Sequence, residues 1–86
     1  MPIINWKKSS DFTHVLKEIR SSGDEIIIIV GRFAEFGWFH VHIIHSLFPN
    51  KKFTFISRDE RVKKLAKHVG YRVIPSVQEI DQILPE

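Results

Sequence analysis

Three histidines, His40, His42 and His45, stand close together in the sequence. Histidine readily binds metals and transfers protons near neutral pH. On a helix His42 and His45 lie on neighbouring turns, so they could supply two ligands to one metal ion. Glu35 is seven positions before His42, which leaves no carboxylate one turn away to complete such a site. We therefore expect no metal and no cofactor, and we place His40 at the edge of the core with a hydrogen-bond partner.

Trp38 belongs to the same predicted helix, which ends at about Phe48. A helical wheel places Trp38, His42 and His45 on one side. The opposite, apolar side holds Phe36, His40, Ile43, Ile44, Leu47 and Phe48. A tryptophan outside the core commonly anchors an interface, because its large ring gains from leaving water. We interpret these three residues as a surface for a protein partner or a second copy of the chain. The alternative is that residues 1–8 cover Trp38.

The junction after residues 24–30 could hold an anion. Gly31 and Arg32 come where a strand passes into a helix, and backbone N–H groups at a helix start can bind phosphate or carboxylate. Residues 31–37 read GRFAEFG, which is neither the Gly-x-Gly-x-x-Gly fingerprint nor a Gly-Lys-Ser/Thr phosphate loop. The two glycines therefore either help to bind a small anion or only permit the turn, and both interpretations stay open.

A second anion candidate, Ser57 with Arg58, follows the next apolar strand along the chain. The carboxyl ends of neighbouring parallel strands share one edge of a sheet, so these residues would lie beside Gly31, where a nucleotide could bind. The spacing of Ser57 and Glu60 also fits a capping box at the start of a helix. Gly31, Arg32, Ser57 and Arg58 are thus the predicted ligand-binding residues, with helix capping as the alternative role.

A lysine-rich helix is predicted over residues 59–69, with Arg61, Lys63, Lys64 and Lys67 on its solvent side. A basic helix can contact nucleic acid or an acidic partner, but it is also an ordinary solvated surface. The chain has 13 Lys and Arg against 10 Asp and Glu, and the resulting net charge of +3 is small for a dedicated nucleic-acid binder. Nucleic-acid binding is therefore expected to be weak or absent.

Residues 26–30 read IIIIV, a run of β-branched apolar residues between two acids and Gly31. An apolar run without alternation predicts a strand covered on both faces, as in the middle of a parallel sheet. Further strands are expected over 52–56 and 71–74, and 3–6 is either an edge strand or part of an extended arm. Since residues 26–30 are the most apolar, we expect them to lie between 52–56 and 71–74.

Helices are predicted between these strands from the spacing of apolar residues and from capping signals. The first follows Ser9 or Ser10, the third follows Ser57, and the fourth follows Ser76. Alternating helices and strands indicate the α/β class. The chain, 1–86, is thus expected to be one small three-layer Rossmann-like or flavodoxin-like domain. Its parallel sheet would have three or four strands, with helices on both faces.

The composition limits the possible functions. The chain has no cysteine, which excludes disulfides and thiolate catalysis. No apolar run approaches the ~20 residues that span a membrane, and the first residues lack the apolar core of a signal peptide, so we expect a cytoplasmic protein. No nucleophile–base pair, metal triad or complete phosphate loop is recognisable. We therefore predict a non-catalytic interaction domain, with small-anion or nucleotide binding as the alternative.

Overall fold

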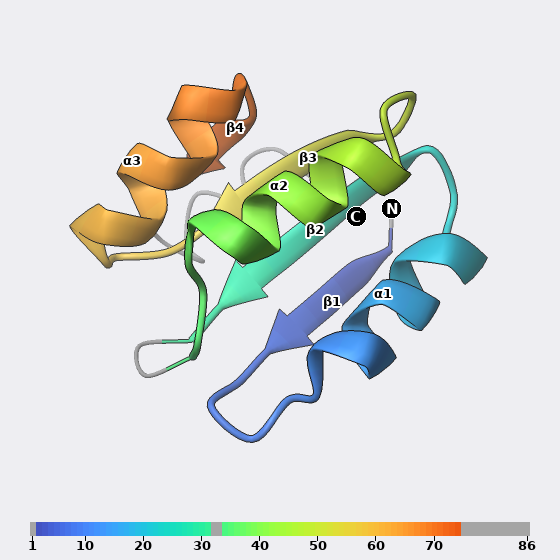
Figure 1. Ribbon diagram of the computed structural model, residues 1–86, viewed down its shortest axis with the longest axis horizontal. Coiled ribbons are helices and arrows are strands. Elements are labelled where there is room, and N and C mark those ends of the chain that lie inside the picture. Colours follow the sequence, from blue (N-terminus) through green and yellow to red (C-terminus); the bar gives the residue numbers. More distant parts are fainter. Residues whose placement is uncertain (1, 32–33, 75–86) are drawn as a thin grey trace, which may run out of the picture.

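The computed structural model describes residues 2–31 and 34–74. Strands and helices alternate along this part of the chain (Figure 1). The elements are β1 (Ile3–Trp6), α1 (Phe12–Ser21), β2 (Glu25–Val30), α2 (Trp38–Leu47), β3 (Lys52–Ile56), α3 (Glu60–Val69) and β4 (Arg72–Ile74). The predicted α/β class is therefore confirmed, and residues 3–6 form a strand of the sheet, not an extended arm.

Within the described residues, four parallel strands form one sheet in the order β1-β2-β3-β4. The isoleucine-rich β2 lies between β1 and β3, and its Ile28 pairs in register with Ile4 and Phe55. The predicted order, with this strand between 52–56 and 71–74, is wrong, because β4 pairs with β3. Both edges of β2 are occupied, by β1 and β3, so the last strand cannot pair with it.

The helices α1, α2 and α3 all pack against the same face of the sheet, with α2 in the middle (Figure 1). A right-handed crossover that steps each time to the next strand on the same side puts every helix on one face. The buried core between sheet and helices contains Ile4, Trp6, Ile26, Ile28, Val30, Phe53 and Phe55 from the strands and Val15, Ile19, Val41, Ile44, Val62 and Ala66 from the helices. No described helix is long and apolar enough to cross a membrane.

The opposite face of the sheet is also apolar. Ile27, Ile56 and Ile74 form a second buried cluster there, with Ile29 packed against it. The two clusters explain why the central strand shows no polar alternation, since its successive side chains enter opposite cores. The helix predicted to follow Ser76 lies outside the described residues, so helices on both faces stay a prediction.

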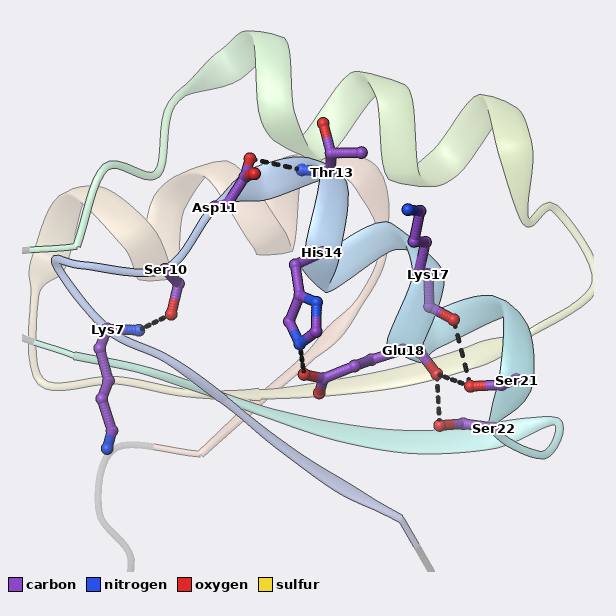
Figure 2. Close-up of polar contacts among 9 residues, drawn as sticks. All are labelled: Lys7, Ser10, Asp11, Thr13, His14, Lys17, Glu18, Ser21 and Ser22. Atoms are coloured by element: carbon purple, nitrogen blue, oxygen red, sulfur yellow. Dashed lines mark hydrogen bonds and ion pairs between the residues drawn. The ribbon is translucent and has the colours of Figure 1, made fainter.

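The first helix starts from an aspartate, not from a serine. Asp11 is the N-cap of α1, and its side chain accepts a hydrogen bond from the Thr13 N–H at 3.1 Å (Figure 2). The Ser10 hydroxyl instead accepts one from the Lys7 N–H at 2.9 Å and closes the turn after β1. The predicted cap at Ser9 or Ser10 is therefore wrong by one or two residues, because Asp caps a helix as well as Ser does.

The third helix shows the same shift. Asp59 is the N-cap of α3 and accepts a hydrogen bond from the Arg61 N–H at 2.9 Å. The Ser57 hydroxyl accepts one from the Asp59 N–H at 3.1 Å, so it supports the cap but does not provide it. The predicted capping box between Ser57 and Glu60 is therefore wrong, and Glu60 is the first residue of the helix.

Candidate interaction surface

The middle helix, α2, has a sequence that is unusual for the outer layer of a domain. Its ten residues, WFHVHIIHSL, include no Asp, Glu, Lys or Arg. A surface without formal charge is easier to dehydrate than the charged surface of most outer helices. Its geometry therefore decides which of these side chains face the core and which remain available to a partner.

Val41 and Ile44 form the inner face of α2, and both are fully buried. Phe48, one turn after Ile44, is buried as well. The predicted inner face is wrong in two places: Leu47 is exposed, and Val41, which it did not include, lies in the core. Apolar residues surround this helix, so their spacing alone does not define one buried side.

Trp38 lies at the junction of α2 and α3. Its ring meets the ring of His42 edge to face, with centroids 4.5 Å apart, and that of His68 on α3 at 5.0 Å. The structure thus brings Trp38 and His42 together, as their four-residue spacing predicts. The alternative of an arm over Trp38 from residues 1–8 fails, because residues 3–6 lie in the sheet as β1.

His45 lies about two turns after Trp38 on α2. Its Nδ1 atom is 3.4 Å from the Tyr71 hydroxyl, and the histidine tautomer decides which of the two donates. Burial raises the pKa of Tyr71 to about 12, so the hydroxyl keeps its proton at neutral pH. Among the residues that the structure describes, no three His, Cys, Asp or Glu side chains come together to hold a metal ion.

The sequence did not reveal the exposed apolar row of α2. Phe39 is 66% exposed and Leu47 is 49% exposed, and the half-buried Ile43 stands between them. Spacings of four residues place the three side chains in one row about 12 Å long. The signal that could have found this row is the missing charge: only three histidines and one serine of α2 are polar, so some apolar side chains must face water.

His40 sits among aromatic rings where α1, α2 and β1 meet. Its ring makes edge-to-face contacts with Phe12 and Trp6, with centroids 4.7 and 5.6 Å away. Its Nδ1 atom accepts a hydrogen bond from the Gly37 N–H at 3.0 Å. Burial lowers the pKa of His40, and the opposing effect of Glu35 is smaller. The predicted position at the core edge, with a hydrogen-bond partner, is confirmed.

Gly31 and Ser57 end the neighbouring strands β2 and β3, so both lie at the carboxyl edge of the sheet. The Gly31 N–H donates to the last carbonyl of β1 at 2.7 Å, and the Ser57 N–H donates to the last carbonyl of β4 at 3.2 Å. Both backbone donors are therefore used within the sheet. Arg58 beside them is exposed, and Arg32 lies outside the described residues.

The helix starts at this edge are occupied by the chain itself. At α2, His40 accepts the Gly37 N–H, and at α3 the Asp59 carboxylate accepts the Arg61 N–H. The charges of Asp59 and Glu35 also oppose an incoming anion. Protein groups thus fill positions that a phosphate would need at a helix N-terminus.

A groove of about 460 Å³ lies at the opposite, amino edge of β2, β3 and β4. Its lining includes Lys51, Lys52 and Arg72, with Glu25 as the acidic member. The Lys51 ammonium is engaged by two carbonyls just after α1, at 2.9 and 3.0 Å. Glu25 is the register partner of Lys52 and offsets its charge. The groove therefore has no strong preference for an anion.

No known protein family, no curated protein and no solved structure matches this chain. Its function is therefore inferred from the residues of the chain. Within the described residues, the feature that the fold alone does not require is the outer side of α2. The name α2 surface is used below for Trp38, Phe39, His42, Ile43 and Leu47.

Proposed function

We propose that this chain is a non-catalytic interaction domain that binds another protein through the α2 surface. One observation carries the proposal: three large apolar side chains of one helix stay exposed, namely Phe39 at 66%, Leu47 at 49% and Trp38 at 45%. Single exposed apolar residues are normal on a soluble domain. A group of them on a helix without charged residues is typical of the centre of an interface, where charge is depleted and aromatic residues are enriched.

The energy available from this surface supports a specific but moderate affinity. Full burial of a large apolar side chain contributes about 1.5–3 kcal/mol, so the exposed parts of Trp38, Phe39 and Leu47 together offer roughly 2–5 kcal/mol. A micromolar complex needs about 8 kcal/mol after the cost of association is met. Polar contacts around the apolar row must therefore add to the binding.

Trp38 is suited to act as an anchor because its own neighbours already restrain it. His42 on the same helix and His68 on α3 both contact its ring. A side chain that is ordered before binding loses less entropy on binding. Tryptophan is also among the residues whose removal most often costs an interface its affinity.

The other predicted functions receive less support. A small anion or nucleotide near Gly31, Ser57 and Arg58 would compete with backbone and side-chain groups that already use the donors there. Nucleic-acid binding through the basic face of α3 would leave the apolar row of α2 without a role. A protein partner accounts for both the exposed apolar row and its restrained tryptophan.

Affinity capture from cells that make this protein tests the proposal, with wild type and a Phe39→Ser, Leu47→Ser double variant as baits. Ile3→Ser is the matched control, since Ile3 is an apolar side chain of β1 with a similar exposure of 46%. We expect a protein that binds purified wild type and the control, and that loses at least about tenfold in affinity for the double variant. Equal binding to all three baits would refute the role of the α2 surface.

A further inference from the structure

We infer that the α2 surface takes an acidic amphipathic helix of the partner protein. This inference rests on the proposed function and adds the chemistry of the partner to it. Its basis is the position of the charged side chains of α1 and α3 relative to the apolar row of α2.

The two helices that flank α2 are basic. Together α1 and α3 contain six Lys and Arg but only two Glu, while α2 contains none of these residues. Both glutamates have a partner within their own helix: Glu18 is 2.9 Å from the imidazole of His14 (Figure 2), and Glu60 is 3.1 Å from the Lys63 ammonium. The exposed charge of these two helices is therefore mainly positive.

On α1, the cation on the side that faces α2 is Arg20. The ring centroids of Phe12 and Phe39 are 6.5 Å apart, so this side of α1 faces α2. Arg20 follows Phe12 by two four-residue steps and stands on the same side of the helix. Leu47 follows Phe39 by the same two steps. Because both helices run from the carboxyl edge of the sheet back to the amino edge, the exposed Arg20 comes alongside Leu47.

On α3, the cations on the side that faces α2 are Arg61 and Lys64. The contact of His68 with Trp38 identifies the side of α3 that faces α2. Lys64 stands one turn before His68 and Arg61 two turns before it, and both are exposed. Tyr71, just after α3, meets His45 near the end of α2, so the two helices advance in the same direction and Lys64 and Arg61 lie beyond the start of α2. The apolar row thus has cations near both of its ends, with Arg20 beside Leu47 and with Lys64 and Arg61 beyond Phe39.

This arrangement favours one of three candidate partners for the α2 surface. A second copy of the chain would bring the same surface against itself across a two-fold axis, so that the cations at its ends would approach like charges. A single-stranded nucleic acid would be attracted to these cations, but it gains from stacking on aromatic faces and not from the aliphatic Ile43 and Leu47. An acidic protein segment complements both the charge and the apolar row.

The shape of the apolar row favours a helix in this segment. Phe39, Ile43 and Leu47 form a straight ridge of about two turns, which matches the spacing of apolar anchors on one side of an amphipathic helix. Acidic residues near the two ends of such a helix would meet Arg20 at one end and Arg61 and Lys64 at the other. These contacts would supply the polar part of the affinity that the apolar side chains cannot provide alone.

The test uses synthetic amphipathic peptides of about 18 residues, with Leu and Phe on one side and Glu on the others. The controls are the same peptide with Lys in place of Glu, and a scrambled acidic peptide of identical composition. Fluorescence anisotropy should show that the acidic amphipathic peptide binds at least about tenfold tighter than either control, with a preference over the Lys peptide that shrinks as salt is added.

Protein variants separate the charge from the apolar row. Arg61→Glu with Lys64→Glu should weaken binding of the acidic peptide and favour the Lys peptide, whereas Lys52→Glu with Arg72→Glu, an equal charge change away from the helical layer, should not. Equal binding of both amphipathic peptides, lost in the Phe39→Ser, Leu47→Ser variant, would overturn the inference and leave the proposed function standing.

Three further results would also overturn the inference. The first is acidic-peptide binding that the Phe39→Ser, Leu47→Ser variant keeps, which would refute the proposed α2 surface itself. The second is a wild-type dimer in sedimentation that this variant dissociates, since the occupant would then be a second copy. The third is tight binding of a single-stranded oligonucleotide with no binding of the acidic peptide.

Discussion

The Nδ1 atom of His40 accepts a hydrogen bond from the backbone N–H of Gly37 at 3.0 Å, so the start of α2 is capped by a residue of its own first turn. Gly37 has no side chain, although the N-cap position usually provides an oxygen for one of the free N–H groups. This cap forms only while Nδ1 carries no proton. The part of α2 that bears Trp38 and Phe39 therefore depends on the protonation of one histidine.

Acidification should destabilise the domain through His40. Burial holds the pKa of His40 below its usual value of 6.5, and Glu35 opposes this only in part. As the pH falls, His40 therefore takes up a proton at a higher pH in the unfolded chain than in the folded chain. The contribution of His40 to stability is fully present above pH 6.5 and is lost as the pH falls through the folded-state pKa. Urea denaturation at about pH 7.5 and about pH 5 should give a lower unfolding free energy at the acidic pH.

The variant His40→Gln isolates this effect from the other titrating groups. Glutamine can accept the same Gly37 N–H, as it does in a capping box, but it does not titrate. We expect His40→Gln to keep most of the stability at neutral pH and to lose less than wild type on acidification. An equal loss for both proteins would show that His40 is not responsible for the pH dependence.

Removing side-chain volume from the centre of β2 should be costly. Ile28 is fully buried and pairs in register with Ile4 and Phe55. Ile28→Ala should cost about 2–5 kcal/mol and Ile28→Val about 0.5–1.5 kcal/mol, a large share of the stability of a small domain. Ile3→Ala, at an exposed position of the edge strand β1, is the control for urea denaturation. A similar loss for Ile3→Ala and Ile28→Ala would contradict the interior position of β2.

The sequence predicts the elements of this fold better than their arrangement. The apolar run in residues 26–30 indicates a strand covered on both faces, and Ile27 and Ile28 do enter opposite clusters. Strand order cannot be predicted in the same way, because the apolar pattern of a strand does not specify which other strands pair with it. The pairing of β1 with β2 keeps β4 away from β2, and it involves residues far apart in the chain.

The candidate site was predictable only where one helix determines it. The four-residue spacing of Trp38 and His42 places them together, and their rings are in contact. The contact with His68 comes from a different helix, which the pattern of α2 cannot reveal. The exposure of Phe39 and Leu47 was missed because apolar residues surround α2, so packing on the sheet, and not periodicity, decides which side is buried.

Asp59 should stabilise α3 more than its partly exposed position suggests. Its carboxylate accepts the Arg61 N–H at 2.9 Å and stands at the positive end of the helix. Asp59→Ala should lower the unfolding free energy by about 1 kcal/mol, whereas Asp59→Asn, which keeps the acceptor, should cost less. Asp24→Ala is the matched control, because Asp24 is exposed but precedes a strand. Equal urea midpoints for Asp59→Ala and Asp24→Ala would mean that α3 does not start at Asp59.

Gly31 is expected to be needed for packing at the end of β2. An added Cβ would lie 3.2 Å from the Trp6 carbonyl oxygen and 3.7 Å from the Lys7 Cα. That oxygen accepts the Gly31 N–H at 2.7 Å, so it cannot move aside without stretching a bond between β1 and β2. Gly31→Ala should therefore destabilise the domain by about 1–3 kcal/mol, as overpacking does elsewhere.

Gly23→Ala is the matched control, since nothing lies within 4 Å of its added Cβ and its φ is not positive. That substitution should be neutral or stabilise by up to about 1 kcal/mol, because it restricts the unfolded chain. If thermal melts show no difference between the two variants, close packing does not explain the glycine, and the ligand-binding interpretation of Gly31 gains support.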